Sequence, residues 1–250
     1  MPREEALEAF LLRNAALHVY ELGDLHPPFA ARCRWFPVEG NGGIRAVALR
    51  YDGVVPTLLC FERHDVAAAQ QAVAEAAATQ PRPAYAHVSP ELRSALPVPV
   101  GAPSHHMKMG LHDPTQLPMA HAEPLGPADE GELLAFYEEA YPGNWFDPWM
   151  LTTQAYRGVR QDGRLVAVAG VHVVAGRCAA LGNIAVHPGH RGQGLGSRVT
   201  AALCHALLGR LGPAATIGLN VHADNVAARV LYQRLGFVDV APYVECALPE

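Results

Sequence analysis

Lysine is nearly absent from this chain, which has a single lysine, Lys108, in 250 residues. The formal net charge is −5, and the sequence contains no run of basic residues. We therefore expect neither a nucleic acid nor an anionic membrane as a main partner, because binding a polyanion needs clustered positive charge. No apolar stretch approaches the ~20 residues of a membrane-spanning helix. The start, Met1 to Glu5, lacks the apolar core of a signal peptide, so we expect a cytoplasmic protein.

Paired metal-binding and redox motifs are also missing. The five cysteines are scattered, with no Cys-x-x-Cys pair, so we expect reduced and mostly buried thiols. Histidine is abundant, and its densest group contains His105, His106, His112 and His121. The spacing of this group matches no common metal motif. We therefore expect no metal, and we interpret the stretch as a linker or a strand.

A glycine-rich loop, Arg-Gly-Gln-Gly-Leu-Gly at 191–196, follows an apolar run from Leu181 to Val186. A long amphipathic stretch begins directly afterwards, near Ser197. The order strand, glycine turn, helix leaves several backbone amides free at the helix start, where the peptide dipoles add partial positive charge. Glycine permits close approach of the backbone and a positive φ. The pattern predicts a loop that binds phosphate.

Two other nucleotide-binding motifs use the same physics. A dinucleotide-binding fold places the loop after its first strand and an acidic residue about 20 residues later. In this sequence the position where the acidic residue is expected lies at the end of the amphipathic stretch, between Gly209 and Pro213. Several predicted strands also precede the loop. A nucleotide phosphate loop needs Gly-Lys-Ser/Thr, and the only lysine is Lys108. The sequence fits neither motif.

A second motif lies further along the chain. Asn225, Ala228 and Tyr232 share one face of a predicted helix, because they are three and seven residues apart. Asp224 or Asn225 can cap the start of this helix. Gly236 can take the left-handed position that ends it.

Together the two motifs resemble those of the GNAT superfamily of acyl-CoA-dependent N-acyltransferases. Its loop pattern is Arg or Gln, two residues, Gly, one residue, then Gly or Ala, which Arg191, Gly194 and Gly196 supply. The resemblance implies a mixed α/β sheet that splays near Ile184 to Val186, so that the pantetheine arm of acetyl-CoA pairs with exposed backbone. The residues that it implies for cofactor binding are Ile184, Val186, Arg191, Gly192, Gln193, Gly194, Leu195, Gly196, Ser197, Asn225 and Ala228.

The resemblance also implies the reaction. An amine attacks the thioester of acetyl-CoA directly, and we expect a primary amine on a small molecule. Tyr232 is the candidate general acid for the departing thiolate, because a phenol with a pKa near ~10 keeps its proton at pH 7. The alternative for Tyr232 is simple packing on the sheet. An alternative for the whole protein is a non-catalytic acyl-CoA-binding sensor or regulator.

The general base stays open. The strand before the loop, Gly182 to Val186, has no carboxylate, and Asn183 in it cannot accept a proton. A neutral amine would need no strong base. Besides a chain of waters, the candidates are Glu138, Glu139, His172 and Glu245.

The acceptor pocket is expected, from the family's geometry, to lie between an aromatic-rich loop and the carboxyl-terminal segment. The loop runs from Tyr141 to Trp149, and Tyr243 and Glu245 belong to the carboxyl-terminal segment. The loop's tryptophans, Trp145 and Trp149, either contact the amine or brace the loop against the core.

The predicted fold is α+β, with two domains at 1–118 and 119–250, in a monomer or a homodimer. The second domain is the GNAT domain, and the first, which is smaller, is either a degenerate GNAT-like domain or an unrelated α+β extension. In the first domain we expect helices at 4–22 and 66–78 and strands at 44–51, 54–62 and 85–88. In the second we expect helices at 127–140, from near 197, and from 225, with strands at 156–160, 165–174, 178–186, 216–221 and 238–246.

Overall fold

A computed structural model describes residues 3–53, 55–79 and 83–249. The chain forms two compact units. Unit 1 contains residues 1–108, 221–225 and 239–250, and unit 2 contains 109–220 and 226–238. These units differ from the predicted domains at 1–118 and 119–250, because the last strand of the chain pairs with a strand of unit 1. A single cut in the sequence therefore cannot separate them.

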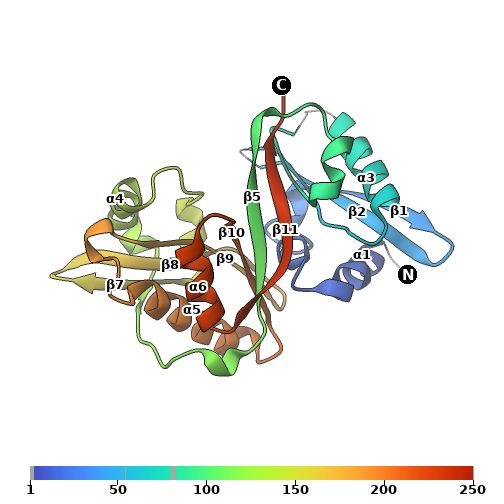
Figure 1. Cartoon of the computed structure of the whole chain (residues 1–250). Helices are drawn as coiled ribbons and strands as arrows, with labels where there is room; N and C mark the ends of the chain where they lie inside the picture. The colour runs from blue at the N-terminus through green and yellow to red at the C-terminus, as the bar shows by residue number, and fades with distance from the viewer. Residues whose placement is uncertain (1–2, 54, 80–82, 250) are drawn as a thin grey trace. The chain divides into compact units, whose positions relative to one another are not determined.

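Unit 1 is built on strands in the order β1-β2-β3-β4-β11. The pair β3 and β4 is parallel, and the other neighbours are antiparallel. Residues of β5 up to Lys108 and of β11 from Asp239 belong to this unit. The elements, labelled in Figure 1, are α1 (Arg3–Leu11), α2 (Val19–Asp24), β1 (Cys33–Gly40), β2 (Gly43–Tyr51), β3 (Thr57–Cys60), α3 (Val66–Ala78), β4 (Tyr85–Val88), β5 (Val100–Leu111) and β11 (Phe237–Ala247).

Helix α3 connects the two parallel strands β3 and β4. Asp65 caps its start, because the side chain accepts a 3.2 Å hydrogen bond from the backbone amide of Ala68. The helix packs an alanine face on the sheet, and small side chains allow this close approach. The buried members of this face are Ala68, Ala69, Ala72, Val73, Ala76 and Ala77.

The predictions for unit 1 are confirmed for helix 66–78 and for strand 85–88. The helix predicted at 4–22 is divided into α1 and α2, with a short 3-10 turn between them. The strand predicted at 54–62 is shorter, Thr57–Cys60, and Val54 lies outside the described residues. Strand β1 was not predicted. Of the histidine group expected to be a linker or a strand, His105 and His106 lie in strand β5, whereas His112 and His121 follow it.

Unit 2 is built on strands in the order β6-β7-β8-β9-β10. The pair β9 and β10 is parallel, and the rest are antiparallel. In Figure 1, α4 and α5 lie on opposite sides of β7 and β8. The elements are β6 (Glu123–Leu125), α4 (Glu130–Ala140), β7 (Tyr156–Gln161), β8 (Arg164–Ala175), β9 (Cys178–Val186), α5 (Leu195–Leu211), β10 (Thr216–His222) and α6 (Val226–Arg234).

Two tight turns join the antiparallel strands β7, β8 and β9 of unit 2. Asp162 and Gly163 have φ values of 49° and 76°, and they join the antiparallel strands β7 and β8. Two positive φ values in a two-residue turn match the right-handed twist of the flanking strands. Gly176, with a φ of 56°, lies in the turn that joins the antiparallel strands β8 and β9. The sheet is therefore mixed, as expected.

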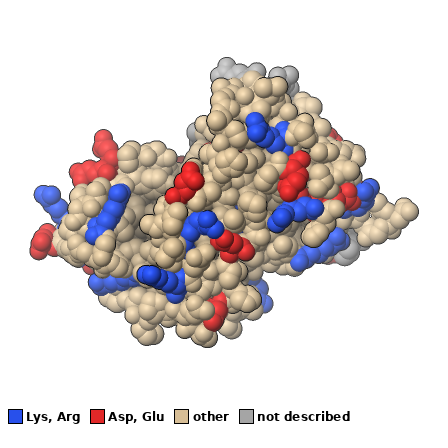
Figure 2. All heavy atoms as spheres, in the orientation of Figure 1, with Lys and Arg blue, Asp and Glu red and all other residues tan. Residues whose placement is uncertain are grey.

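Arg160 on β7 fixes the start of α4 to the sheet. Its guanidinium lies 2.8 Å from Asp129 and 2.7 Å from Glu132, and it also pairs with Glu123. These three carboxylates raise the pKa of Arg160 above its usual range. On the face in Figure 2, Lys and Arg side chains lie among Asp and Glu side chains.

Candidate active site

Strands β9 and β10 pair over only four residues. Thr216 to Leu219 pair in parallel with Cys178 to Leu181, and among the described residues this pairing ends at Leu181. Because β9 continues to Val186, its last residues offer amides and carbonyls on the side that β10 has left. Ile184 and Val186 are partly exposed, whereas Asn183 and Ala185, which alternate with them, are buried. This opening lies where the sequence predicts a splayed sheet.

The opening coincides with a kink at Asn183, whose φ is 53°. Three side chains hold this residue. The hydroxyl of Tyr137 donates a 2.7 Å hydrogen bond to the Asn183 carbonyl. The side-chain amide of Asn183 donates to the Tyr156 hydroxyl at 2.9 Å, and its Oδ1 lies 3.3 Å from Nε2 of His172. A buried polar residue with this many partners fixes the course of the strand.

The glycine-rich loop follows β9 and leads into α5. Gly192 and Gly194 have φ values of 78° and 74°, and a Cβ added to either would contact nothing within 4 Å. Glycine is needed there for the backbone conformation and not for lack of space. Gly196 differs, because a Cβ there would lie 3.0 Å from Leu231 of α6. It allows α5 and α6 to pack closely.

Helix α5 begins with unpaired amides. Its first hydrogen bond runs from the amide of Arg198 to the carbonyl of Gly194, at 3.0 Å. The amides of Leu195, Gly196 and Ser197 therefore have no acceptor within the helix. Gly194 in a left-handed conformation supplies no side-chain cap. Exposed Arg191 and Gln193 flank this end, so it can bind an anion.

Tyr232 lies on α6 and is 8 % exposed. Its ring packs against Phe237 with a centroid distance of 5.9 Å. No described residue forms a hydrogen bond to its hydroxyl, and burial raises the pKa of Tyr232 above its usual value. The phenol is therefore neutral at pH 7 and can donate a proton.

The sequence is similar to those of known proteins. Residues 123–237 match the model of the acetyltransferase (GNAT) family. The [ribosomal protein bS18]-alanine N-acetyltransferase of Escherichia coli is 36% identical over 104 residues, which is 40% of this chain and 68% of that protein. The chain belongs to the GNAT acetyltransferase family.

Two further proteins extend the comparison. A mycothiol acetyltransferase of Mycolicibacterium paratuberculosis is 33% identical over 150 residues, which is 50% of this chain and 48% of that protein. The chain thus spans about half the length of the mycothiol acetyltransferases that it matches. A tandem GNAT protein from the clavulanic acid biosynthesis pathway superposes on 100% of this chain and 97% of its own, with a TM-score of 0.56 and 17% identity. That likeness shows the fold alone.

In this GNAT chain the candidate bases have different surroundings. Glu138 is exposed, and Glu139 lies 3.3 Å from His187 at the surface. Glu245 belongs to unit 1, where its carboxylate lies 2.9 Å from His87, and this contact lowers the pKa of Glu245. His172 is the candidate that contacts the kink at Asn183, and burial lowers its pKa, so its ring is neutral at pH 7.

The aromatic loop of the GNAT unit is braced by a residue that the sequence did not single out. Phe146 packs against Tyr137 and Tyr156, with ring centroid distances of 5.1 and 5.7 Å. Trp145 is 50% exposed and Tyr141 42%. Phe146 therefore anchors the loop, and Trp145 presents a large part of its ring to solvent.

The division of the chain into two units separates two residues that the sequence predicts to bind the cofactor. Ala228, on α6, belongs to unit 2 together with the glycine-rich loop, whereas Asn225, directly before α6, is grouped with unit 1. A role for Asn225 in cofactor binding stays a prediction. Tyr243, expected beside the acceptor, is also grouped with unit 1.

The sequence also missed Tyr137 and Tyr156, which hold Asn183. Both are more than nine-tenths buried, and nothing in their spacing separates them from ordinary core residues. Within the described residues, no group of three or more His, Cys, Asp and Glu side chains is arranged to hold a metal ion. No described helix is long and apolar enough to span a membrane.

Proposed function

We propose that this protein transfers the acetyl group of acetyl-CoA, bound in unit 2, to a primary amine of a small molecule. The observation that carries the proposal is the loss of pairing between β9 and β10 after Leu181. This leaves the backbone of β9 open to the pantetheine arm, directly before the loop that binds an anion. The amides of Leu195, Gly196 and Ser197 would receive the pyrophosphate.

In the proposed reaction the amine nitrogen attacks the thioester carbonyl, and a C–N bond forms as the carbonyl electron pair moves to oxygen. Collapse of this intermediate breaks the C–S bond. The thiolate takes a proton from the Tyr232 hydroxyl, the proton lost by the amine passes to water, and water returns a proton to the Tyr232 phenolate. An amine that arrives neutral needs no carboxylate on β9, which agrees with the absence of acid between Gly182 and Val186.

The relatives bear on the class of acceptor. One is named for mycothiol, a small molecule, and the other for the alanine of a ribosomal protein. We favour the small molecule because the stretch similar to the mycothiol enzymes is the longer, at 150 residues against 104.

We also propose that unit 1 is a degenerate copy of the GNAT fold. Its β3-α3-β4 segment, with two parallel strands joined by a helix, repeats the order of β9-α5-β10. The loop before α3 differs, because it carries Glu62 and Asp65 in place of glycines.

The test measures release of free CoA thiol from acetyl-CoA with a panel of small primary amines and, separately, a peptide with an amino-terminal alanine. We expect turnover with at least one small amine and none in the Gly194→Asp variant. Turnover with the peptide alone would replace the proposed acceptor by a protein amino terminus. Tight binding of acetyl-CoA with no thiol release from any acceptor would favour the acyl-CoA sensor instead.

A further inference from the structure

Unit 1 contains a cavity of about 880 Å³ that plays no part in the proposed reaction. Its walls come from the amino-terminal helices, the β1–β2 hairpin, the loop before α3 and β11. Its size is that of a site for a small organic molecule, since such sites measure roughly 300–1,000 Å³. The floor is apolar and buried, and it includes Phe10, Leu17 and Ile44.

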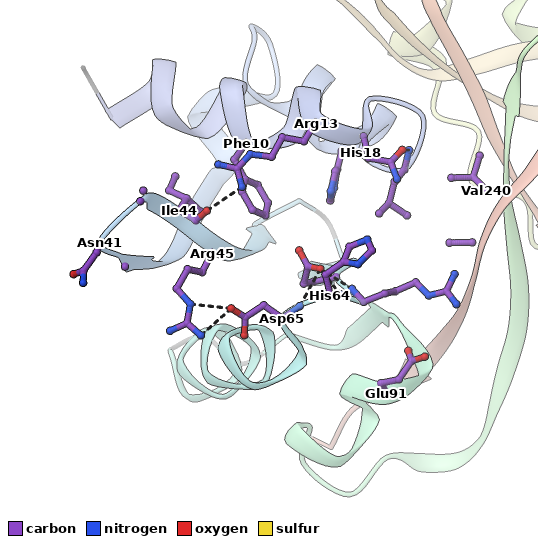
Figure 3. A pocket seen from close by; sticks show the side chains of 18 residues that line it. Phe10, Arg13, His18, Asn41, Ile44, Arg45, His64, Asp65, Glu91 and Val240 are labelled. Atoms are coloured by element: carbon purple, nitrogen blue, oxygen red, sulfur yellow. Dashed lines mark hydrogen bonds and ion pairs between the residues drawn. The ribbon is translucent and has the colours of Figure 1, made fainter.

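One buried polar side chain, His18, lines this cavity. In Figure 3, Phe10 and His18 point down from the amino-terminal helical segment. Nδ1 of His18 lies 3.1 Å from Oε1 of Glu21, which is itself buried. Because a carboxylate only accepts hydrogen bonds, Nδ1 carries a proton, and in the neutral ring Nε2 keeps a lone pair. The ring is thereby held in one orientation.

The chain's single lysine lies beside this pair of side chains. Lys108 is 1% exposed, and its Nζ lies 3.9 Å from Oε2 of Glu21. The same Nζ donates a 2.9 Å hydrogen bond to the Leu17 carbonyl and lies 3.5 Å from the centre of the Phe61 ring. Lys108 lowers the pKa of Glu21 against the effect of burial, so the carboxylate is ionised. Buried ions cost stability, and here they hold His18, the member of the group that lines the cavity, which is typical of a functional site.

The acidic side chains around the rim are occupied by the protein itself. Oε1 of Glu62 accepts hydrogen bonds from the amides of Arg63 and His64, at 2.8 and 2.6 Å, and lies 3.4 Å from that of Asp65. Asp65 pairs with Arg45 at 2.8 Å, as the dashed lines in Figure 3 show. Glu62 is therefore hydrogen-bonded by backbone amides and keeps its negative charge, whereas Asp65 is paired with a guanidinium.

Apart from Arg45, the basic side chains of the rim form no ion pair with a carboxylate among the described residues. Arg13 and Arg63 have no carboxylate within ion-pair distance among the described residues, and His64 has none either. Arg13 lies 5.1 Å from the centre of the Phe10 ring, at the edge of the apolar floor. The remaining acidic side chain is the exposed Glu91. The rim thus offers two guanidinium groups to a negative charge above an apolar floor.

We propose that this cavity binds a small aromatic carboxylate that carries a hydrogen-bond donor. Its ring lies on the apolar floor, its carboxylate pairs with Arg13 or Arg63, and its donor bonds to Nε2 of His18. Guanidinium groups match a carboxylate with two parallel hydrogen bonds. The site lies wholly within unit 1, so the inference does not depend on the proposed acetyl transfer.

Coenzyme A is a poor fit for this cavity. The backbone amides before α3 that would donate hydrogen bonds to a pyrophosphate already donate them to the carboxylate of Glu62. A phosphate there would have to displace Glu62 and would face its negative charge. A ligand whose single carboxylate pairs with Arg13, on the amino-terminal helical segment, avoids that repulsion.

The test is calorimetric titration of the full chain with 4-hydroxyphenylacetate, with 4-methylphenol as the probe that lacks the carboxylate and phenylacetate as the probe that lacks the hydroxyl. We expect 4-hydroxyphenylacetate to bind about tenfold or more tightly than 4-methylphenol, since charged hydrogen bonds contribute that much. Arg13→Ala and Arg63→Ala change exposed side chains, so the variants should fold. At least one should weaken binding about tenfold.

Arg32→Ala is the matched control, because Arg32 is exposed in the same unit and does not line the cavity. Its affinity should equal that of the wild type. The proposal is wrong if 4-hydroxyphenylacetate does not bind at millimolar concentration, if 4-methylphenol binds equally well, or if all three arginine variants behave alike. Competition by free CoA that survives Gly194→Asp would make the cavity a coenzyme site instead.

Discussion

The hydroxyl of Tyr137 donates a 2.7 Å hydrogen bond to the carbonyl of Asn183, the residue at which β9 kinks. Tyr137→Phe removes this donor and leaves a buried carbonyl without its partner. The loss should cost about 1–3 kcal/mol of stability. Because the kink directs the open edge of β9, the KM for acetyl-CoA should rise several-fold, with a smaller change in kcat.

Thermal unfolding and steady-state kinetics measure these two effects. Tyr51→Phe is the control, because it also removes a tyrosine hydroxyl. Tyr51 lies in unit 1, and no hydrogen bond of its hydroxyl is found among the described residues. An unchanged KM in Tyr137→Phe, together with a lower melting temperature, would show that the hydrogen bond serves stability alone.

Much of unit 2 could be predicted from the sequence because its signals are local. The turn at Asp162 and Gly163, the glycines before α5 and the spacing from Ala228 to Tyr232 each depend on neighbouring residues. The bonds from Tyr137 and Tyr156 to Asn183 span 46 and 27 residues, and they depend on how distant strands and helices pack. No local sequence pattern predicts such contacts.

Unit 1 shows a different limit of prediction from the sequence. Its helix α3 has a local cap and an alanine-rich face, and it could be predicted with its bounds. The division of the chain could not, because β11 pairs with β4 across more than half of the sequence. The buried group behind His18 could not be predicted either, since Lys108 and Glu21 meet only in the folded unit.

Gly194 should tolerate asparagine better than aspartate. Its φ of 74° is a conformation that Asn adopts more readily than most residues. Gly194→Asp adds a negative charge beside the expected pyrophosphate and should abolish CoA binding, whereas Gly194→Asn should weaken it far less. Calorimetry with CoA compares the two. Equal affinities for both variants would mean that the phosphates lie elsewhere.

The stability of unit 1 should fall in acid because of His106. Burial lowers the pKa of His106 to about 4, with further effects from Glu245, His222 and His87. The unfolded state therefore binds more protons between pH 4 and 6.5, so stability is complete above pH 6.5 and is lost as the pH falls towards 4. Glu245, whose pKa is also lowered, adds to the loss in the same direction at lower pH.

His106→Phe tests this dependence, because phenylalanine can keep the stacking on Tyr243, whose ring centroid is 4.9 Å away. After allowance for solvent screening, the loss of stability of the wild type between pH 6.5 and 4 should exceed that of the variant by on the order of 1 kcal/mol. Urea unfolding at a series of pH values measures the difference. Parallel pH curves would assign the acid sensitivity to other groups.

Tyr232→Phe separates binding from chemistry at the proposed active site. The ring is kept, so packing against Phe237 and the affinity for CoA should stay close to those of the wild type. Only the proton donor is lost, and one positioned general acid contributes about 10²–10⁴-fold, so kcat should fall by that factor if departure of the thiolate limits the rate. Burial raises the pKa of Tyr232, so the phenol stays protonated and the wild type should show no loss of activity from this group up to pH 10. A kcat within about threefold of wild type at saturating substrate would mean that water or the substrate ammonium protonates the thiolate.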